Sequence, residues 1–134
     1  MMNEELKKRL RSRRICVVIP TYNNGGTIKA VVEGVLRYCD DVIVVADGCT
    51  DNTLGILHAI ENITVVAYVR NRGKGHALKT GFRTALKQGF SYAITLDGDG
   101  QHYPEDIPLF LQANLQHPHA LIIGSRQLEG VDRS

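Results

Sequence analysis

Apolar runs alternate along this chain with segments of helical periodicity. Runs rich in Val and Ile have the length of buried strands, and they cover residues 15–20, 41–46, 63–69, 91–96 and 120–124. The segments between them show helical spacing or helix caps, and they predict helices over 27–38, from Thr50 or Asp51 to about Ile60, over 75–88 and from Pro104 onward. Continuous apolar strands in repeated β-α units predict an α/β fold, with a Rossmann-like, mostly parallel sheet and helices on both faces.

Polar residues follow each of the first four predicted strands at the point where the strand ends. They occupy 21–24, 47–51 and 70–76, and they include Asp97 and Asp99 after the fourth strand. In open α/β sheets, ligands bind outside the carboxyl ends of the strands. We therefore expect these four groups to meet in one ligand site, because a purely structural interpretation would have to invoke turn chemistry four separate times.

Composition narrows the class of protein. With 134 residues, 43% of them hydrophobic, the chain has the size and the core content of one globular domain. No apolar run is long enough for a transmembrane helix, and no signal peptide is visible. Cys16, Cys39 and Cys49 are odd in number and lack C-x-x-C spacing, which indicates a reducing, cytoplasmic location without a disulfide or a zinc site.

Basic residues crowd the N-terminal segment, residues 1–14, before the first predicted strand. They are Lys7, Lys8, Arg9, Arg11, Arg13 and Arg14. We interpret the segment as a solvated terminal helix, with Glu4 and Glu5 favouring its N-terminal end. The alternative is a peripheral contact with the anionic inner face of a membrane, at about 1 kcal/mol per basic residue. Nucleic-acid binding is not expected, because the chain has no series of aromatic residues that could stack on bases.

Two carboxylates, Asp97 and Asp99, stand directly after the fourth apolar run with Gly98 between them. Carboxylates are costly to bury unpaired, so two of them at the end of a buried strand suggest a divalent cation. Hard cations such as Mg²⁺ take oxygen ligands and usually share them with substrate phosphates. The simpler interpretation is a polar turn, since Asp and Gly are ordinary turn residues.

Rival motifs fail at specific positions. A P-loop would need a hydroxyl residue after Lys74, and an EF-hand beginning at Asp97 would need Gly and Glu where His102 and Pro108 stand. The most serious rival is a haloacid-dehalogenase-type phosphatase with Asp97 as nucleophile. Gln101 departs from the end of that motif, which also belongs on a first strand rather than a fourth.

Five ordered segments carry a resemblance that covers roughly residues 15–126. They are Ile19–Asn23, Val44–Thr53, Asn71–Gly81, Leu96–His102 together with Pro104–Ile107, and Ile123–Arg126. In this order they resemble the inverting family-2 glycosyltransferases of the GT-A fold, the group that includes dolichyl-phosphate mannose synthase. The resemblance implies a UDP- or GDP-sugar donor and an acceptor that is a glycan or a polyprenyl phosphate.

The resemblance also implies a set of donor-binding residues. They are Pro20, Thr21, Tyr22, Asn23, Asp47, Arg72, Lys74, Asp97, Gly98 and Asp99. The first four would line the nucleoside pocket, Asp47 would hydrogen-bond the edge of the base, and Arg72 and Lys74 would lie near the base or the diphosphate. Asp47 could instead be a helix-capping turn residue, and Lys74 a solvated loop charge.

A metal site and an acceptor contact follow from the same resemblance. Asp97 and Asp99 would hold Mg²⁺ or Mn²⁺, with Gln101 as a further ligand on the metal side. Arg126 resembles the arginine that meets an acceptor phosphate, although it could equally be a surface partner of Glu129 or Asp132.

The resemblance ends before the family's acceptor-binding region and its catalytic base. No catalytic residue is identified in this chain, and the base is expected beyond Ser134. We therefore interpret residues 15–134 as a donor-binding half-domain of an apparently truncated enzyme. A nucleotide-sugar-binding module without turnover is the alternative. A missing strand beside the fourth would leave an unpaired sheet edge, which favours self-association.

Overall fold

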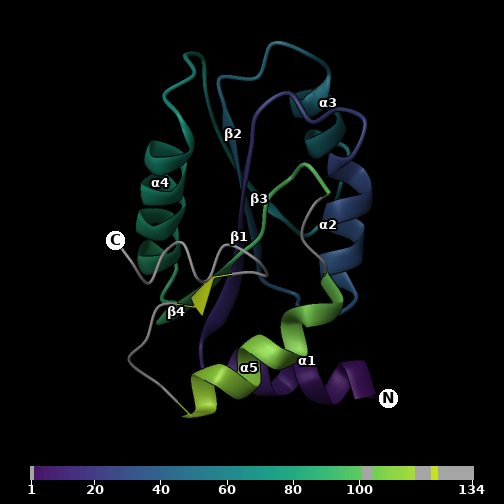
Figure 1. The fold of residues 1–134 in the computed structure, drawn as a ribbon, viewed down its shortest axis with the longest axis vertical. Coiled ribbons are helices and arrows are strands. Elements are labelled where there is room, and N and C mark those ends of the chain that lie inside the picture. The colour runs from purple at the N-terminus through teal and green to yellow at the C-terminus, as the bar shows by residue number, and fades with distance from the viewer. Residues whose placement is uncertain (1, 101–103, 117–121, 124–134) are drawn as a thin grey trace.

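A computed structural model describes residues 2–100, 104–116 and 122–123, and arranges them as alternating strands and helices (Figure 1). Their bounds are α1 Met2–Ser12, β1 Ile15–Thr21, α2 Ile28–Leu36, β2 Val42–Asp47, α3 Thr53–His58, β3 Thr64–Tyr68, α4 Lys74–Lys87, β4 Tyr92–Thr95, the 3₁₀ helix η1 Pro104–Asp106, α5 Ile107–Gln116 and β5 Ile122–Ile123. All strand pairs are parallel, in the order β3-β2-β1-β4-β5. The predicted parallel sheet is confirmed.

The two central strands explain why the sequence runs apolar without alternation. Every residue of β1 and of β2 is buried, since helices cover both faces of the sheet. Val17 and Ile19 pack with α2 and α3 on one face, while Cys16 and Val18 pack with α4 on the other. Figure 1 shows α4 on one side of the strands and α2 and α3 on the opposite side.

Helix α1 packs on the core through its apolar side, while its other side is exposed. It lies beside α5 at the end of the sheet where β1 begins (Figure 1). Leu10 is 1% exposed and belongs to the main core cluster, and Lys7 and Arg11 both pair with Asp40, at 3.2 and 2.6 Å. The prediction of a helix is confirmed, and most of its charged residues are exposed as expected, but its apolar side packs on the core.

Strand β5 lies beside β4. Ile94 pairs with Ile122 and Thr95 with Ile123, so the expected unpaired edge at the fourth strand is wrong over these two pairs. The rest of the predicted fifth strand, 120–124, falls outside the described residues. Across the part of the chain that the structure describes, no helix combines the length and the apolar character needed to cross a membrane.

Candidate functional site

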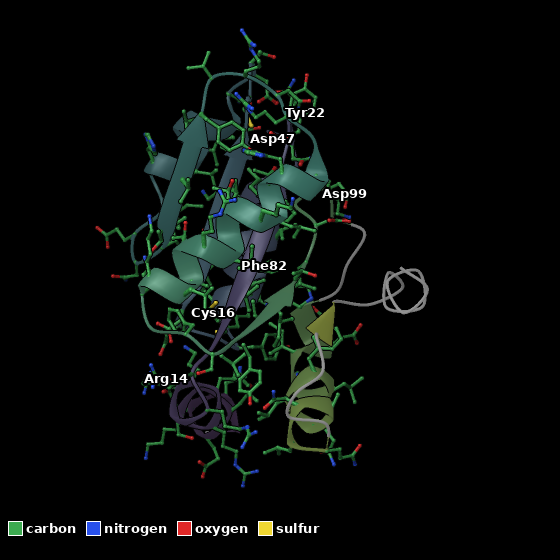
Figure 2. The ribbon with its side chains drawn as sticks, turned by 90° about the vertical axis from the view of Figure 1, so that its left-hand side faces the viewer. Arg14, Cys16, Tyr22, Asp47, Phe82 and Asp99 are labelled. Atoms are coloured by element: carbon green, nitrogen blue, oxygen red, sulfur yellow. The ribbon has the colours of Figure 1, made fainter. Side chains whose placement is uncertain are left out.

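A cavity of about 400 Å³ opens at the carboxyl ends of β1, β2 and β4. Its lining consists of Pro20, Thr21, Tyr22, Asn24, Asp47, Asn71, Gly73, Lys74, Ala77, Asp97, Gly98 and Asp99. The chain places β2 and β3 on one side of β1 and β4 on the other, and such a switch point is where ligands bind in open α/β sheets. Figure 2 shows Tyr22, Asp47 and Asp99 at this end of the molecule and Arg14 at the opposite end.

The cavity gathers most of the residues predicted for donor binding. Of the ten, only Asn23 and Arg72 are absent from the lining. Gln101 and Arg126 fall outside the described residues, so the structure gives no position for either prediction. The convergence of four strand ends therefore holds, because each of the four polar segments contributes to the same cavity.

Sequence analysis missed four lining residues. They are Asn24, Asn71, Gly73 and Ala77. All four belong to the polar segments after the strands or to the family motifs, so the signal was present, but nothing in the spacing separated residues that face the cavity from those that face away.

Asp47 ties the end of β2 to the turn that precedes α4. Asp47 is 3% exposed, and its carboxylate accepts three hydrogen bonds, from the amides of Arg72 (2.9 Å) and Gly73 (2.9 Å) and from Asn71 Nδ2 (3.0 Å). Gly73 has a φ of 97°, and α4 starts at the next residue. Asp47 thus fixes the turn that delivers Lys74 to the cavity.

Two residues next to Asp47, Gly48 in sequence and Tyr68 in space, also shape this part of the site. Gly48 has a φ of 66°, and a side chain there would overlap the backbone of Asn71, so the turn after β2 needs glycine. Burial, and then the neighbouring Asp47 carboxylate, raise the pKa of Tyr68 well above its usual range, so its phenol stays protonated. The Tyr68 ring packs edge-on against His76, with centroids 5.3 Å apart.

The two asparagines in the turn after β1, Asn23 and Asn24, have different hydrogen-bond partners and different roles. Asn24 Oδ1 accepts hydrogen bonds from Thr21 Oγ1 (2.6 Å) and the amide of Tyr22 (3.2 Å), which shapes the cavity wall. Asn23 has a φ of 51°, and its Oδ1 accepts from the amides of Thr50 (2.8 Å) and Asp51 (3.2 Å). The side chain of Asn23 therefore links the loop after β1 to the loop after β2. Tyr22 is 48% exposed and presents an aromatic surface.

Gly98 is confined between β1 and α2. A Cβ atom at this position would lie 2.7 Å from Thr21 Oγ1 and 2.9 Å from Ile28 Cδ1. The amide of Gly98 donates to Pro20 O (3.3 Å), and its carbonyl accepts from Thr27 Oγ1 (2.8 Å). The absence of a side chain lets the backbone between the two carboxylates lie against the end of β1.

Lys74 and Asp97 form an ion pair across the cavity. Lys74 Nζ lies 2.8 Å from Asp97 Oδ1 and 2.9 Å from Oδ2, which joins the start of α4 to the end of β4. Asp97 is partly buried and Asp99 is exposed. The floor of the cavity therefore combines two carboxylates with one ammonium group.

The donor set at Asp97 and Asp99 fits a hard divalent cation that shares its ligands with a bound anion. Residues 2–100, 104–116 and 122–123 contain no group of three or more His, Cys, Asp or Glu side chains that could hold a metal by themselves. Two carboxylates leave most of an octahedral shell to other oxygens, and Mg²⁺ is commonly bound in this way with substrate phosphates. The cavity can therefore take an anionic ligand together with its cation.

Known proteins resemble this chain over most of its length. The UDP-N-acetylglucosamine–dolichyl-phosphate N-acetylglucosaminyltransferase of Methanococcus voltae is 31% identical, over 87% of this chain and 53% of the relative. The polyprenol monophosphomannose synthase of Mycolicibacterium smegmatis is 32% identical, over 89% of this chain and 47% of the relative. The chain thus spans about half the length of these relatives.

A solved structure shares the fold. Glucosyl-3-phosphoglycerate synthase from Mycobacterium tuberculosis, in complex with Mn²⁺, UDP and glucosyl-3-phosphoglycerate, superposes with a TM-score of 0.64 at 27% identity, over 86% of this chain and 44% of that one. The predicted GT-A type of fold is confirmed by this likeness.

A family model decides between the candidate classes. Residues 16–134 match the model described as "Glycosyl transferase family 2". The phosphatase alternative gains no support from the family model or from these relatives. With the ordered motifs, the cavity at the strand ends and this match, the chain belongs to glycosyl transferase family 2.

Proposed function

We propose that this chain forms the donor-binding and metal-binding part of a metal-dependent, inverting glycosyltransferase. Such an enzyme would move a sugar from a nucleoside-diphosphate sugar to an acceptor. The observation that carries the proposal is the single cavity in which an exposed aromatic ring, a lysine ammonium group and two carboxylates meet. These are the groups that a nucleoside, a diphosphate and its cation require.

Each part of the cavity suits one part of the donor. Pro20, Thr21 and Tyr22 offer a partly apolar wall for the nucleoside. Asp47 is an acceptor-only group that lines the cavity and accepts three hydrogen bonds from residues 71–73, and a base N–H would add a further donor to this carboxylate. Lys74 supplies positive charge where the diphosphate would lie.

Asp97 and Asp99 would hold Mg²⁺ or Mn²⁺, with Gln101 as a further ligand. When bound, the cation would act as a Lewis acid that neutralises charge on the departing nucleoside diphosphate. The Mn²⁺ and UDP bound by the related glucosyl-3-phosphoglycerate synthase support this assignment, and they favour uridine as the nucleoside. The name of the Methanococcus voltae relative also specifies a UDP-sugar.

A polyprenyl phosphate is the acceptor that we favour over a glycan. Dolichyl phosphate stands in the name of the Methanococcus voltae relative, and undecaprenyl phosphate in that of a mannosyltransferase from Micrococcus luteus. A phosphate acceptor is already an anion and needs no base to activate it, in contrast to a hydroxyl acceptor. Arg126 is our candidate for the acceptor phosphate contact, and the reaction would take place at the cytoplasmic face of a membrane.

The basic N-terminal segment has a better-supported structural role than a membrane contact. Lys7 and Arg11 pair with Asp40, and Arg13 Nε donates to Asn114 Oδ1 at 2.6 Å. The segment also lies at the opposite end of the sheet from the cavity (Figure 2). A membrane held by this segment would therefore face away from the donor site.

Calorimetric titration of the chain with UDP and GDP, each with and without Mn²⁺, tests the proposal. We expect metal-dependent binding of UDP, weakened at least about tenfold in Asp99→Asn, because interactions with a charged group contribute about 1.5–3 kcal/mol. Glu105→Gln removes an exposed carboxylate outside the cavity and serves as the control. Folded chain that binds neither nucleotide, or an Asp99→Asn variant that binds as well as wild type, would contradict the proposal.

A further inference from the structure

The lysine in the cavity already occupies a cation position. Lys74 Nζ contacts both carboxylate oxygens of Asp97, at 2.8 and 2.9 Å, and the Asp97 side chain is only 18% exposed. The ammonium therefore lies where a divalent cation bound to Asp97 would have to enter. Two positive groups cannot share that carboxylate without repulsion, which is larger at a partly buried site than in water.

The backbone of Lys74 has a fixed position, and its side chain is partly exposed. The amides of Arg72 and Gly73 donate to the buried carboxylate of Asp47, so the first residue of α4 has a fixed position. The side chain of Lys74 is 49% exposed, and it carries a flexible stem of four carbons. Its ammonium group can therefore leave Asp97 for another anion in the same cavity without any movement of the helix.

We propose that Lys74 is a built-in counter-cation that keeps the metal position at Asp97 closed until a diphosphate arrives. The diphosphate takes over the ammonium group, which removes the positive charge that competes with Mg²⁺ or Mn²⁺ for the Asp97 carboxylate. The inference rests on the proposed donor function of the cavity and adds an order to it. Metal alone binds weakly, and metal and nucleotide each strengthen the binding of the other by the same factor, as linkage requires.

The test measures the binding of Mn²⁺ to the chain without nucleotide, by titration calorimetry and by the loss of the free-ion signal in electron paramagnetic resonance. Lys74→Met removes the charge and keeps most of the length of the side chain. We expect it to bind Mn²⁺ about fivefold more tightly than wild type, the effect of one partly exposed ion pair. UDP binding in the presence of Mn²⁺ should weaken by a similar factor. Damage to the fold would weaken the binding of both ligands, so tighter Mn²⁺ binding together with weaker UDP binding would not be explained by it.

Three further variants locate the effect. Lys74→Arg keeps the charge and should bind Mn²⁺ as wild type does. Lys79→Met removes an exposed lysine from the same helix, outside the cavity, and should change neither affinity. In Lys74→Met combined with Asp97→Asn the gain in Mn²⁺ affinity should disappear, because the carboxylate that the metal gained is absent. Lys74→Gln repeats the charge removal with a polar side chain in case the Met variant does not fold.

The outcomes separate this inference from the proposed function. Equal Mn²⁺ affinity in wild type and in both charge-removal variants overturns the inference, while UDP binding by wild type leaves the donor function intact. A gain that persists without Asp97 also overturns it, since the metal then binds elsewhere. Tighter Mn²⁺ binding by Lys74→Met in a chain that binds no UDP would support the ion pair and contradict the donor function.

Discussion

The three thiols of the chain have different surroundings. Burial raises the pKa of Cys16 to about 12 and the pKa of Cys39 to about 12, and both side chains are at most 1% exposed. Cys49 is partly exposed, in the turn after β2. Because the thiolate is the reactive form, the two buried thiols are inert for two reasons, burial and protonation.

We expect one of the three cysteines to react with an aromatic disulfide reagent in the folded chain at pH 8, and all three after denaturation. Since the pKa of Cys16 and of Cys39 lies near 12, raising the pH from 7 to 9 should leave both protonated and unreactive. The measurement is the stoichiometry of thiol release with time. Cys49→Ser should abolish the rapid phase, and a rapid phase of two or three thiols would contradict the assignment.

For Asp47, the sequence predicted the location of the residue but not its hydrogen-bond partners. Its position after a buried strand predicted a place in the ligand site, and Asp47 does line the cavity. Its three hydrogen bonds to residues 71–73 could not be predicted, because they depend on how closely two loops approach each other in space. The contacts of Asn23 with Thr50 could not be predicted for the same reason, and its proposed part in donor binding stays a prediction.

At the scale of elements, α4 packs closely on the sheet because it carries a glycine. A Cβ atom at Gly81 would overlap Val18 Cγ1 and would lie 3.3 Å from Val45 Cγ2. The apolar periodicity predicted this helix within one residue at each end, 75–88 against the observed Lys74–Lys87. The short α3 was less predictable, because its end depends on local turns after His58 rather than on any periodic signal.

Gly81→Ala should destabilise the chain by about 1–3 kcal/mol, since the added methyl group must displace Val18 or shift the helix. Gly75→Ala is the matched control in the same helix, where a Cβ atom meets nothing within 4 Å. There the substitution should stabilise by about 0.5–1 kcal/mol, through helix propensity. Midpoints of urea unfolding measure both changes. Equal effects of the two substitutions would show that α4 does not depend on close approach at Gly81.

For the whole molecule, α1 closes the core at the end of the sheet opposite the cavity. The many basic residues of this segment suggested a solvated helix, and its two inward-facing leucines were not recognised as core residues. Leu10 is buried, and Leu6 packs against the same cluster. The convergence of strand ends was predictable because parallel strands impose it, whereas the docking of α1 depends on contacts between distant segments.

Leu10→Ala should reduce the free energy of unfolding by about 2–5 kcal/mol, the usual cost of removing a buried leucine side chain. Arg9→Ala alters an exposed neighbour and should stay within about 0.5 kcal/mol of wild type. Both are measured by urea unfolding with one optical probe of the sheet. If Leu10→Ala unfolds at the same midpoint as Arg9→Ala, the helix contributes nothing to the domain.

The place of β1 between β2 and β4 also has a consequence for synthesis of the chain. On one edge, β1 pairs with β4, which lies far along the sequence. The contact of Cys16 with Tyr92, for example, spans 76 residues. While a ribosome makes the intervening segment, one edge of β1 has no partner, although β2 and β3 can already pair. We therefore expect nascent chains that stop before β4 to be prone to aggregation, and the cavity to form only after Asp99 has left the exit tunnel.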